Sequence, residues 1–251
     1  MKKANGIFVL GTDTEIGKTV ITGLLAGLLR EQGIRIGVMK PVASGGIPTP
    51  EGIISEDAIF LKEAAGVEDN LRKINPYCLK NPMAPGVAAR IEKVDVSFPV
   101  IAESYRYLQQ RYDLTLVEGA GGLIVPLTPS FLTNIDEIKM LSIPVILVGR
   151  GTLGTINHIC LTVRVLQQEG IEILGIILNR YQERGIVEET NPQVIEEITG
   201  IKIFGVIPQI DGISLNPPRL GRGIATLEDN LRPSWWKYLE EMLPSCTGPG
   251  S

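Results

Sequence analysis

The sequence predicts an α/β fold with one domain, in which helices cover both faces of a mostly parallel central sheet. Three observations predict it. Short apolar runs alternate with segments of helical periodicity, several of the runs are apolar throughout, and glycine or polar residues directly follow most of them. Alternation of this kind is typical of βαβ units, and continuously apolar strands are typical of a sheet buried on both faces.

The individual elements follow from these patterns. The expected strands are Ile7–Leu10, Ile36–Met39, Leu114–Val117, Val145–Val148, Ile173–Leu178 and Ile203–Val206. The expected helices are Lys18–Gln32, Glu56–Ala65, Val100–Arg111, Asn134–Leu141, Leu153–Glu169 and Pro192–Thr199. Residues 75–90 contain three prolines and predict a loop with a short helix over the same edge of the sheet.

The chain of 251 residues contains no low-complexity linker, so we expect residues 1–245 to form one domain and 246–251 a disordered tail. Trp235 and Trp236 are expected to anchor a C-terminal helical segment by burial.

Composition narrows the class of protein. Apolar residues make up 44% of the chain, which is sufficient for an ordinary globular core, and the net charge of −4 argues against general nucleic-acid binding. No apolar run reaches the length of a membrane-spanning helix, and no signal peptide is evident, so a cytoplasmic protein is expected. The three cysteines are scattered and there is one histidine, which predicts neither a zinc site nor a disulfide framework.

The segment Gly11–Thr19 (the phosphate loop) lies between the first strand and the first helix. Backbone N–H groups of such a loop, and the helix N-terminus, bind phosphates. Lys18 is expected to reach the β- and γ-phosphates and the Thr19 hydroxyl to bind Mg²⁺. The glycines Gly11 and Gly17 are one residue further apart than in the usual P-loop, so Thr12 occupies the position of the first glycine. The fold is therefore expected to be like that of the P-loop NTPases.

Charged side chains follow other predicted strands and are expected at the same edge of the sheet, where ligands bind in doubly wound folds. Glu118 ends the third strand and is placed as a Mg²⁺ ligand, direct or through water. Lys40 ends the second strand, where a second cation suits a reaction that joins two anions. Asp57 is in the first turn of a helix, where capping alone can explain a carboxylate, so its metal role stays open at this point.

These motifs together resemble those of the dethiobiotin synthetase family. The resemblance covers residues 7 to about 210 and rests on the phosphate loop with its extra residue, Lys40–Gly45, Ser55–Asp57, Asn75–Tyr77, Val117–Gly122, Gly154–His158 and Asn179. It implies that 7,8-diaminopelargonate takes up CO₂ as a carbamate, that ATP activates the carbamate as a carbamic–phosphoric anhydride, and that the second amine closes the ring to give dethiobiotin, ADP and phosphate. Mg²⁺ and ATP are the implied cofactor and co-substrate.

The resemblance also implies residue roles. Lys40, Lys18 and Thr14 would be catalytic, with Lys40 stabilising the carbamate and the transferring phosphoryl group. Ser44 and Asn157 would bind the substrate, and Thr19, Asp57 and Glu118 would bind Mg²⁺, which makes a metal role for Asp57 the expectation. The implied nucleotide-binding residues are Glu15, Ile16, Gly17, Lys18, Thr19, Val20, Asp57, Glu118, Gly119, Ala120, Gly121, Asn179, Pro208, Gln209 and Ile210. The turn Gly154–His158 would meet the substrate of a second copy, which implies a homodimer.

Two departures and two alternatives accompany the resemblance. Arg180 stands where the family often has a smaller or acidic residue, and residues 208–210 fit the base-binding segment only in part. One alternative is an amidation ligase of the cobyrinic-acid kind, which normally has a glutaminase domain for which this chain is too short. The other is an ATPase switch of the deviant-Walker kind, which carries a second lysine near the start of its loop, and none lies between Gly11 and Lys18.

Overall fold

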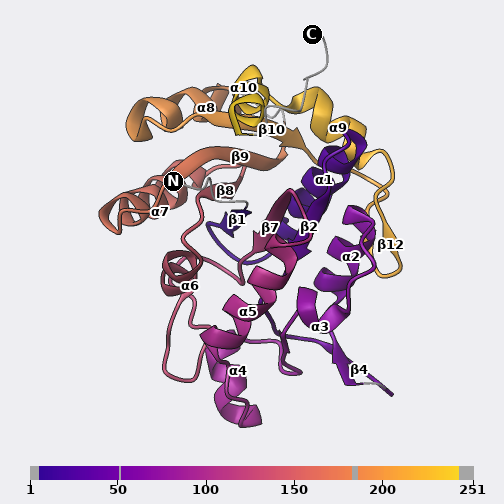
Figure 1. The fold of residues 1–251 in the computed structure, drawn as a ribbon. Helices are drawn as coiled ribbons and strands as arrows, with labels where there is room; N and C mark the ends of the chain where they lie inside the picture. The colour runs from indigo at the N-terminus through magenta and orange to yellow at the C-terminus, as the bar shows by residue number, and fades with distance from the viewer. Residues whose placement is uncertain (1–5, 51, 183–185, 243–251) are drawn as a thin grey trace.

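The computed structural model describes residues 6–50, 52–182 and 186–242. Six parallel strands form its central sheet, in the order β10-β9-β8-β1-β7-β2 (Figure 1). The strands are β1 Gly6–Gly11, β2 Ile36–Met39, β7 Leu114–Glu118, β8 Val145–Arg150, β9 Ile173–Tyr181 and β10 Ile203–Pro208. Each of the six predicted strands is confirmed, and so is the mostly parallel α/β fold with helices on both faces.

Helices connect these strands and cover the sheet. They are α1 Lys18–Glu31, α2 Glu56–Ala65, α3 Leu71–Ile74, α4 Pro85–Glu92, α5 Phe98–Gln109, α6 Asn134–Leu141, α7 Thr155–Gln168, α8 Ile186–Thr199, α9 Gly223–Asn230 and α10 Pro233–Met242. The predicted helix Pro192–Thr199 starts too late, because the helix already begins at Ile186. Residues 186–191 precede Pro192 in the helix, so the proline lies in its interior.

Three small sheets complete the described structure. The parallel pair β3 Val42–Ala43 and β6 Tyr77–Cys78 follows β2, and the hairpin β4 Ile47–Thr49 and β5 Gly52–Ile54 comes next to it in sequence. A second hairpin joins β11 Ser214–Leu215 and β12 Pro218–Arg219. The short helix predicted within residues 75–90 is α4, which extends slightly beyond them.

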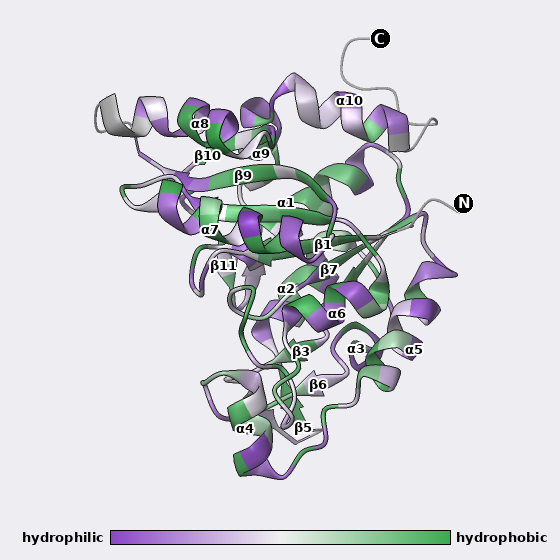
Figure 2. Cartoon of the chain, turned by 90° about the vertical axis from the view of Figure 1, so that its left-hand side faces the viewer, coloured by the Kyte–Doolittle hydropathy of each residue, from purple (hydrophilic) through white to green (hydrophobic). Residues whose placement is uncertain are grey.

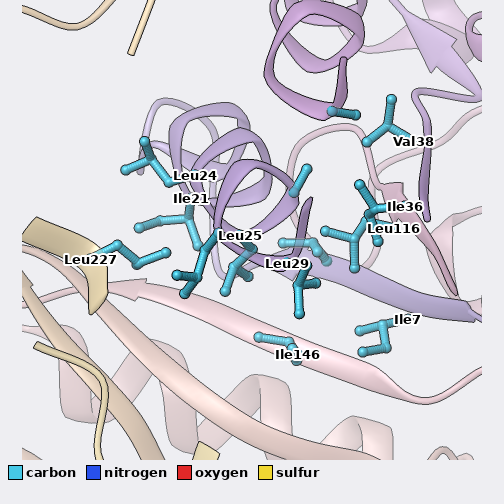
Figure 3. Packing of buried hydrophobic residues seen from close by; sticks show 14 of the residues in the cluster. Ile7, Ile21, Leu24, Leu25, Leu29, Ile36, Val38, Leu116, Ile146 and Leu227 are labelled. Atoms are coloured by element: carbon cyan, nitrogen blue, oxygen red, sulfur yellow. The ribbon is translucent and has the colours of Figure 1, made fainter. Parts of the chain in front are cut away.

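The core consists of two apolar layers, one on each face of the sheet, because successive strand residues point to opposite faces. On β1, Ile7 and Val9 pack in the layer with α1, α2, α9 and α10, whereas Phe8 and Leu10 pack in the layer with α4 to α8. Figure 3 shows the first layer, with side chains from α1 lying over Ile7 and Ile146 of the sheet. Figure 2 shows the hydrophobic colour running along the central strands, while the helices carry both colours.

The C-terminal helix is anchored as expected. Trp235 is fully buried, with its ring edge-on to Phe204 of β10 at a centroid distance of 5.7 Å, and Trp236 packs at the border of the same layer. The tail predicted at 246–251 lies outside the described residues. Within the described ranges, no helix has the length and apolar character needed to cross a membrane.

Candidate functional site

The phosphate loop connects the carboxyl end of β1, in the middle of the sheet, to the start of α1. Gly17 caps α1 with a left-handed φ of 87°, and a Cβ there would come 2.2 Å from Nδ2 of Asn179, so glycine is required on both counts. The Lys18 side chain folds back, and its Nζ donates to the Asp13 carbonyl at 2.7 Å. A Cβ on Gly11 would lie 2.7 Å from that same Nζ. The glycine at position 11 therefore leaves the space that the Lys18 side chain occupies within the phosphate loop.

Lys40 follows β2 and its backbone is fixed on both sides. Its N–H donates to the Ile74 carbonyl at 2.8 Å, and its carbonyl accepts from Nδ2 of Asn75 at 2.6 Å. The side chain is 6% exposed and places its Nζ between two carboxylates, 3.0 Å from Oδ2 of Asp57 and 2.5 Å from Oε1 of Glu118. The structure thus brings the lysine and both predicted metal ligands into direct contact.

Thr19 joins the same group. Its Oγ1 donates to Oε1 of Glu118 at 2.8 Å, which links the first turn of α1 to the end of β7. Asp57 reaches the group because Ser55 caps α2 by accepting from the Ala58 N–H, so that the first turn of α2 faces the site. Lys40, Asp57, Glu118 and Thr19 are called the lysine–carboxylate cluster below.

Burial and charge set the protonation of these groups. Burial opposes the charge of Lys40, but Asp57 and Glu118 outweigh it and raise the pKa of the ammonium, while Lys40 lowers the pKa of Asp57. Complete burial raises the pKa of Glu118 despite the contact with Lys40. Burial, followed by repulsion from Lys40, lowers the pKa of Lys18 to about 8. Two lysines are therefore held close together only because carboxylates lie beside them.

The cluster has the donor chemistry of a magnesium site. It offers one hydroxyl and two carboxylates, which are the hard oxygen ligands that Mg²⁺ takes beside phosphate and water. Oε2 of Glu118 is buried and has no hydrogen-bond partner in the described structure, so one oxygen is left to bind a cation. The described residues contain no group of three or more His, Cys, Asp or Glu side chains that could hold a metal ion.

One of the predicted base-binding residues, Asn179, contacts the phosphate loop directly. Asn179 on β9 is buried and its Nδ2 donates to the Ile16 carbonyl at 2.8 Å. Pro208 ends β10 and pairs with Tyr181, two residues after Asn179, so β9 and β10 end side by side. Asn179 is therefore next to the phosphate loop although the two are far apart in the sequence.

Two arginine side chains donate hydrogen bonds to the Glu15 carbonyl of the phosphate loop, and neither contact was predicted. Arg180 has a left-handed φ of 55°, and its Nη1 donates to the Glu15 carbonyl at 2.9 Å; Arg150 reaches the same oxygen at 3.4 Å. No short sequence pattern identifies such contacts, because they join residues 135 and 165 positions apart.

The predicted catalytic residue Thr14 and the predicted substrate ligands Ser44 and Asn157 are not members of the lysine–carboxylate cluster. Thr14, Ser44 and Asn157 are exposed, and neither Ser44 nor Asn157 has a side-chain hydrogen bond to another described residue. The nearby Gly45 and Gly46 are hydrogen-bonded to Asn81 and Leu79, so the segment after Lys40 is ordered although Ser44 is free. These three side chains remain available to a small molecule.

The chain is similar in sequence to proteins of known family. A family model described as an AAA domain matches residues 5–216. The curated protein named ATP-dependent dethiobiotin synthetase BioD from Clostridium perfringens is 37% identical over 210 residues, which are 83% of this chain and 92% of that protein. The protein of the same name from Methanococcus vannielii is 40% identical over 204 residues, covering 80% and 92%.

Solved structures match more distantly. The septum site-determining protein MinD of Pyrococcus horikoshii, complexed with Mg-ADP, superposes with a TM-score of 0.53 at 19% identity, covering 90% of this chain and 95% of that one. A ParA family ATPase of Chlorobium tepidum gives a TM-score of 0.56 at 14% identity, covering 95% and 98%. At these identities the similarity concerns the fold alone.

Proposed function

The chain belongs to the ATP-dependent dethiobiotin synthetases, and we propose that the lysine–carboxylate cluster and the phosphate loop are the place where its reaction occurs. The enzyme is an ATP-dependent ligase that forms dethiobiotin. The observation that carries the proposal is the buried Lys40 ammonium, held 3.0 Å from Asp57 and 2.5 Å from Glu118 beside a phosphate-binding loop.

The reaction must bring two anions together. An oxygen of the substrate carbamate attacks the γ-phosphorus of ATP, and the bond from that phosphorus to ADP breaks. The second amine then attacks the carbamate carbon, the bond from carbon to the phosphate oxygen breaks, and the amine gives up a proton as the ring closes. Cations placed in advance reduce the repulsion between carbamate and triphosphate, which is the largest obstacle to the first step.

Each cation has a position suited to this task. Lys18 lies within the phosphate loop, where it would exchange its bond to the Asp13 carbonyl for phosphate oxygens. Lys40 would exchange a carboxylate contact for an oxygen of the carbamate or of the γ-phosphate. Thr14, in the exposed part of the loop, and Ser44, four residues after Lys40, would bind the substrate amines or carbamate.

Thr19, Asp57 and Glu118 would hold Mg²⁺, whose chemistry when bound is to neutralise and orient the phosphates. The orphaned Oε2 of Glu118 supports this assignment. The backbone of residues 15–20 and the loop 119–121 would surround the phosphates. Oδ1 of Asn179 would accept a hydrogen bond from adenine, since its Nδ2 is engaged with Ile16, and residues 208–210 would line the base.

A second copy of the chain would complete the substrate site. Asn157 and Leu161 are one turn apart on the exposed face of α7, and Leu161 is 59% exposed. Leu153, just before this helix, is 82% exposed. Apolar side chains so exposed beside a polar residue expected to bind substrate support a homodimer through this face. Cytoplasmic location and the absence of nucleic-acid binding stay predictions from the sequence.

The proposal is tested by incubating the protein with 7,8-diaminopelargonate, ATP, Mg²⁺ and bicarbonate, followed by mass spectrometry. The diamine should gain a carbonyl group and lose two hydrogens, with one ADP released per ring closed. ATP hydrolysis at the same rate with and without the diamine, and no cyclic urea, would instead favour an ATPase switch. The absence of a second lysine between Gly11 and Lys18 argues against that alternative.

A further inference from the structure

Both amide N–H groups of the Asn134 side chain donate hydrogen bonds to one neighbouring loop. Asn134 is the first residue of α6 and is fully buried. Its Nδ2 donates to the Ala120 carbonyl at 2.8 Å and to the Gly122 carbonyl at 2.7 Å. An asparagine amide has two N–H donors, so its donor capacity is used entirely on residues 119–122, called the glycine loop below.

The glycine loop lies between Glu118 and the phosphate loop. It begins directly after Glu118, and the Gly119 N–H is fixed on the Val9 carbonyl at 3.1 Å. Gly121 has a left-handed φ of 66°, which few other residues adopt. Gly122 packs on the phosphate loop, since a Cβ there would come 3.2 Å from the Thr12 carbonyl. The phosphate loop has hydrogen bonds of its own, from the Thr12 N–H to the Val148 carbonyl and from Asn179 to the Ile16 carbonyl, so a shift of the glycine loop would act chiefly on Glu118.

The other half of the Asn134 amide is unsatisfied. Its Oδ1 is buried without a hydrogen-bond partner in the described structure and faces Gly119, whose Cβ, if present, would lie 2.8 Å away. A buried acceptor without a partner destabilises the folded state. The asparagine carries this cost while its two N–H groups pair with the Ala120 and Gly122 carbonyls of the glycine loop.

The helix itself does not depend on this amide. The N-terminus of α6 has its own capping box, in which the Thr133 N–H donates to Oδ2 of Asp136 at 2.7 Å. The Asn134 side chain points instead to the glycine loop, so its contribution can be separated from helix stability by substitution.

We propose that Asn134 is a positioning residue of the nucleotide site, which holds the glycine loop in place and through it sets Glu118 for Mg²⁺-dependent nucleotide binding. This inference rests on the proposed metal–nucleotide site. Because the effect passes through Glu118, it should fall on the part of nucleotide affinity that Mg²⁺ supplies.

The test is calorimetric titration with ADP in the presence of Mg²⁺ and in the presence of a chelator. For the wild type, Mg²⁺ should increase the affinity for ADP. In Asn134→Leu this increase should be about tenfold smaller, which is equivalent to about 1.4 kcal/mol. Without Mg²⁺, the ADP affinity of the variant should stay within about twofold of the wild-type value. Asn134→Ala also removes the donors without adding bulk or charge, so it should behave alike and serves where the leucine variant folds poorly.

Asp136→Ala is the matched control, because it breaks the capping box and leaves the amide intact. It should lower Tm while keeping the gain from Mg²⁺. If Mg²⁺ increases ADP affinity in both Asn134 variants as much as in the wild type, the proposed role of Asn134 is wrong, while the proposed metal site is unaffected. A wild type whose ADP affinity ignores Mg²⁺ would overturn the metal site, and this inference with it.

Discussion

The Nζ of Lys40 lies 2.5 Å from Oε1 of Glu118, although the two residues are 78 positions apart in the sequence. They meet because β2 and β7 are parallel neighbours, so that the residues at their carboxyl ends emerge side by side. Both side chains are buried, and each would be costly to bury without the other. This ion pair is the centre of the site and the basis of the first prediction.

Lys40→Gln should keep nucleotide binding and lose most turnover, by about 100-fold or more in kcat, because the cation nearest the reacting anions is removed. ADP affinity by calorimetry and kcat by ADP release check the two parts. Lys237→Gln on the exposed face of α10 is the control. Unchanged turnover in Lys40→Gln would remove this residue from the mechanism.

Gly17→Ala should abolish tight nucleotide binding, with a loss of at least about tenfold in ADP affinity. The new Cβ would meet Nδ2 of Asn179 at 2.2 Å in addition to the strain of φ 87°. Gly33→Ala is a matched control, because φ there is 81° but nothing lies within 4 Å of the added Cβ. It should cost about 1 kcal/mol of unfolding free energy and leave ADP affinity unchanged. Equal behaviour of the two variants would show that the contact with Asn179 is unimportant.

Glu137 on α6 should make the protein less stable as pH rises. Burial raises the pKa of its carboxyl to about 8, and its Oε1 has no hydrogen-bond partner in the described structure. The folded state then keeps a proton that the unfolded chain releases, so stability is greatest below the ordinary glutamate pKa and falls until pH passes about 8.

Glu137→Gln should therefore raise the free energy of unfolding at pH 8 by on the order of a few kcal/mol and change it little at pH 5, as measured in urea. Glu68→Gln, at an exposed position, provides the comparison. A gain of the same size at both pH values would mean that ionisation of Glu137 is not the cause.

Leu153→Asp should weaken the proposed homodimer, because a charge would replace an 82% exposed leucine at the start of the α7 face. Light scattering after size exclusion should show a monomer at concentrations where the wild type is dimeric, with a higher KM for the diamine. Ile198→Asp, 61% exposed on α8, should change neither. A wild type that is monomeric would refute the dimer directly.

Much of the fold could be predicted because its signals are local. The strand of Leu114–Glu118 and the first turn of α2 are visible as an apolar run and a capping serine. The interior proline of α8 was misread, because helix starts are inferred from residues that also occur elsewhere in helices. The roles of Asn75 and Asn134 were not found, since both amides bind backbone carbonyls of distant segments and no spacing in the sequence marks them.

The sequence by itself determined the α/β class, the phosphate loop, and which strand ends carry lysine or carboxylate, because each depends on neighbouring residues. Only the tertiary structure decided that Lys40, Asp57, Glu118 and Thr19 touch, and that Ser44 and Asn157 are exposed. Strand order and helix docking set these distances, and they arise from packing of the two apolar layers, to which residues far apart in the chain contribute.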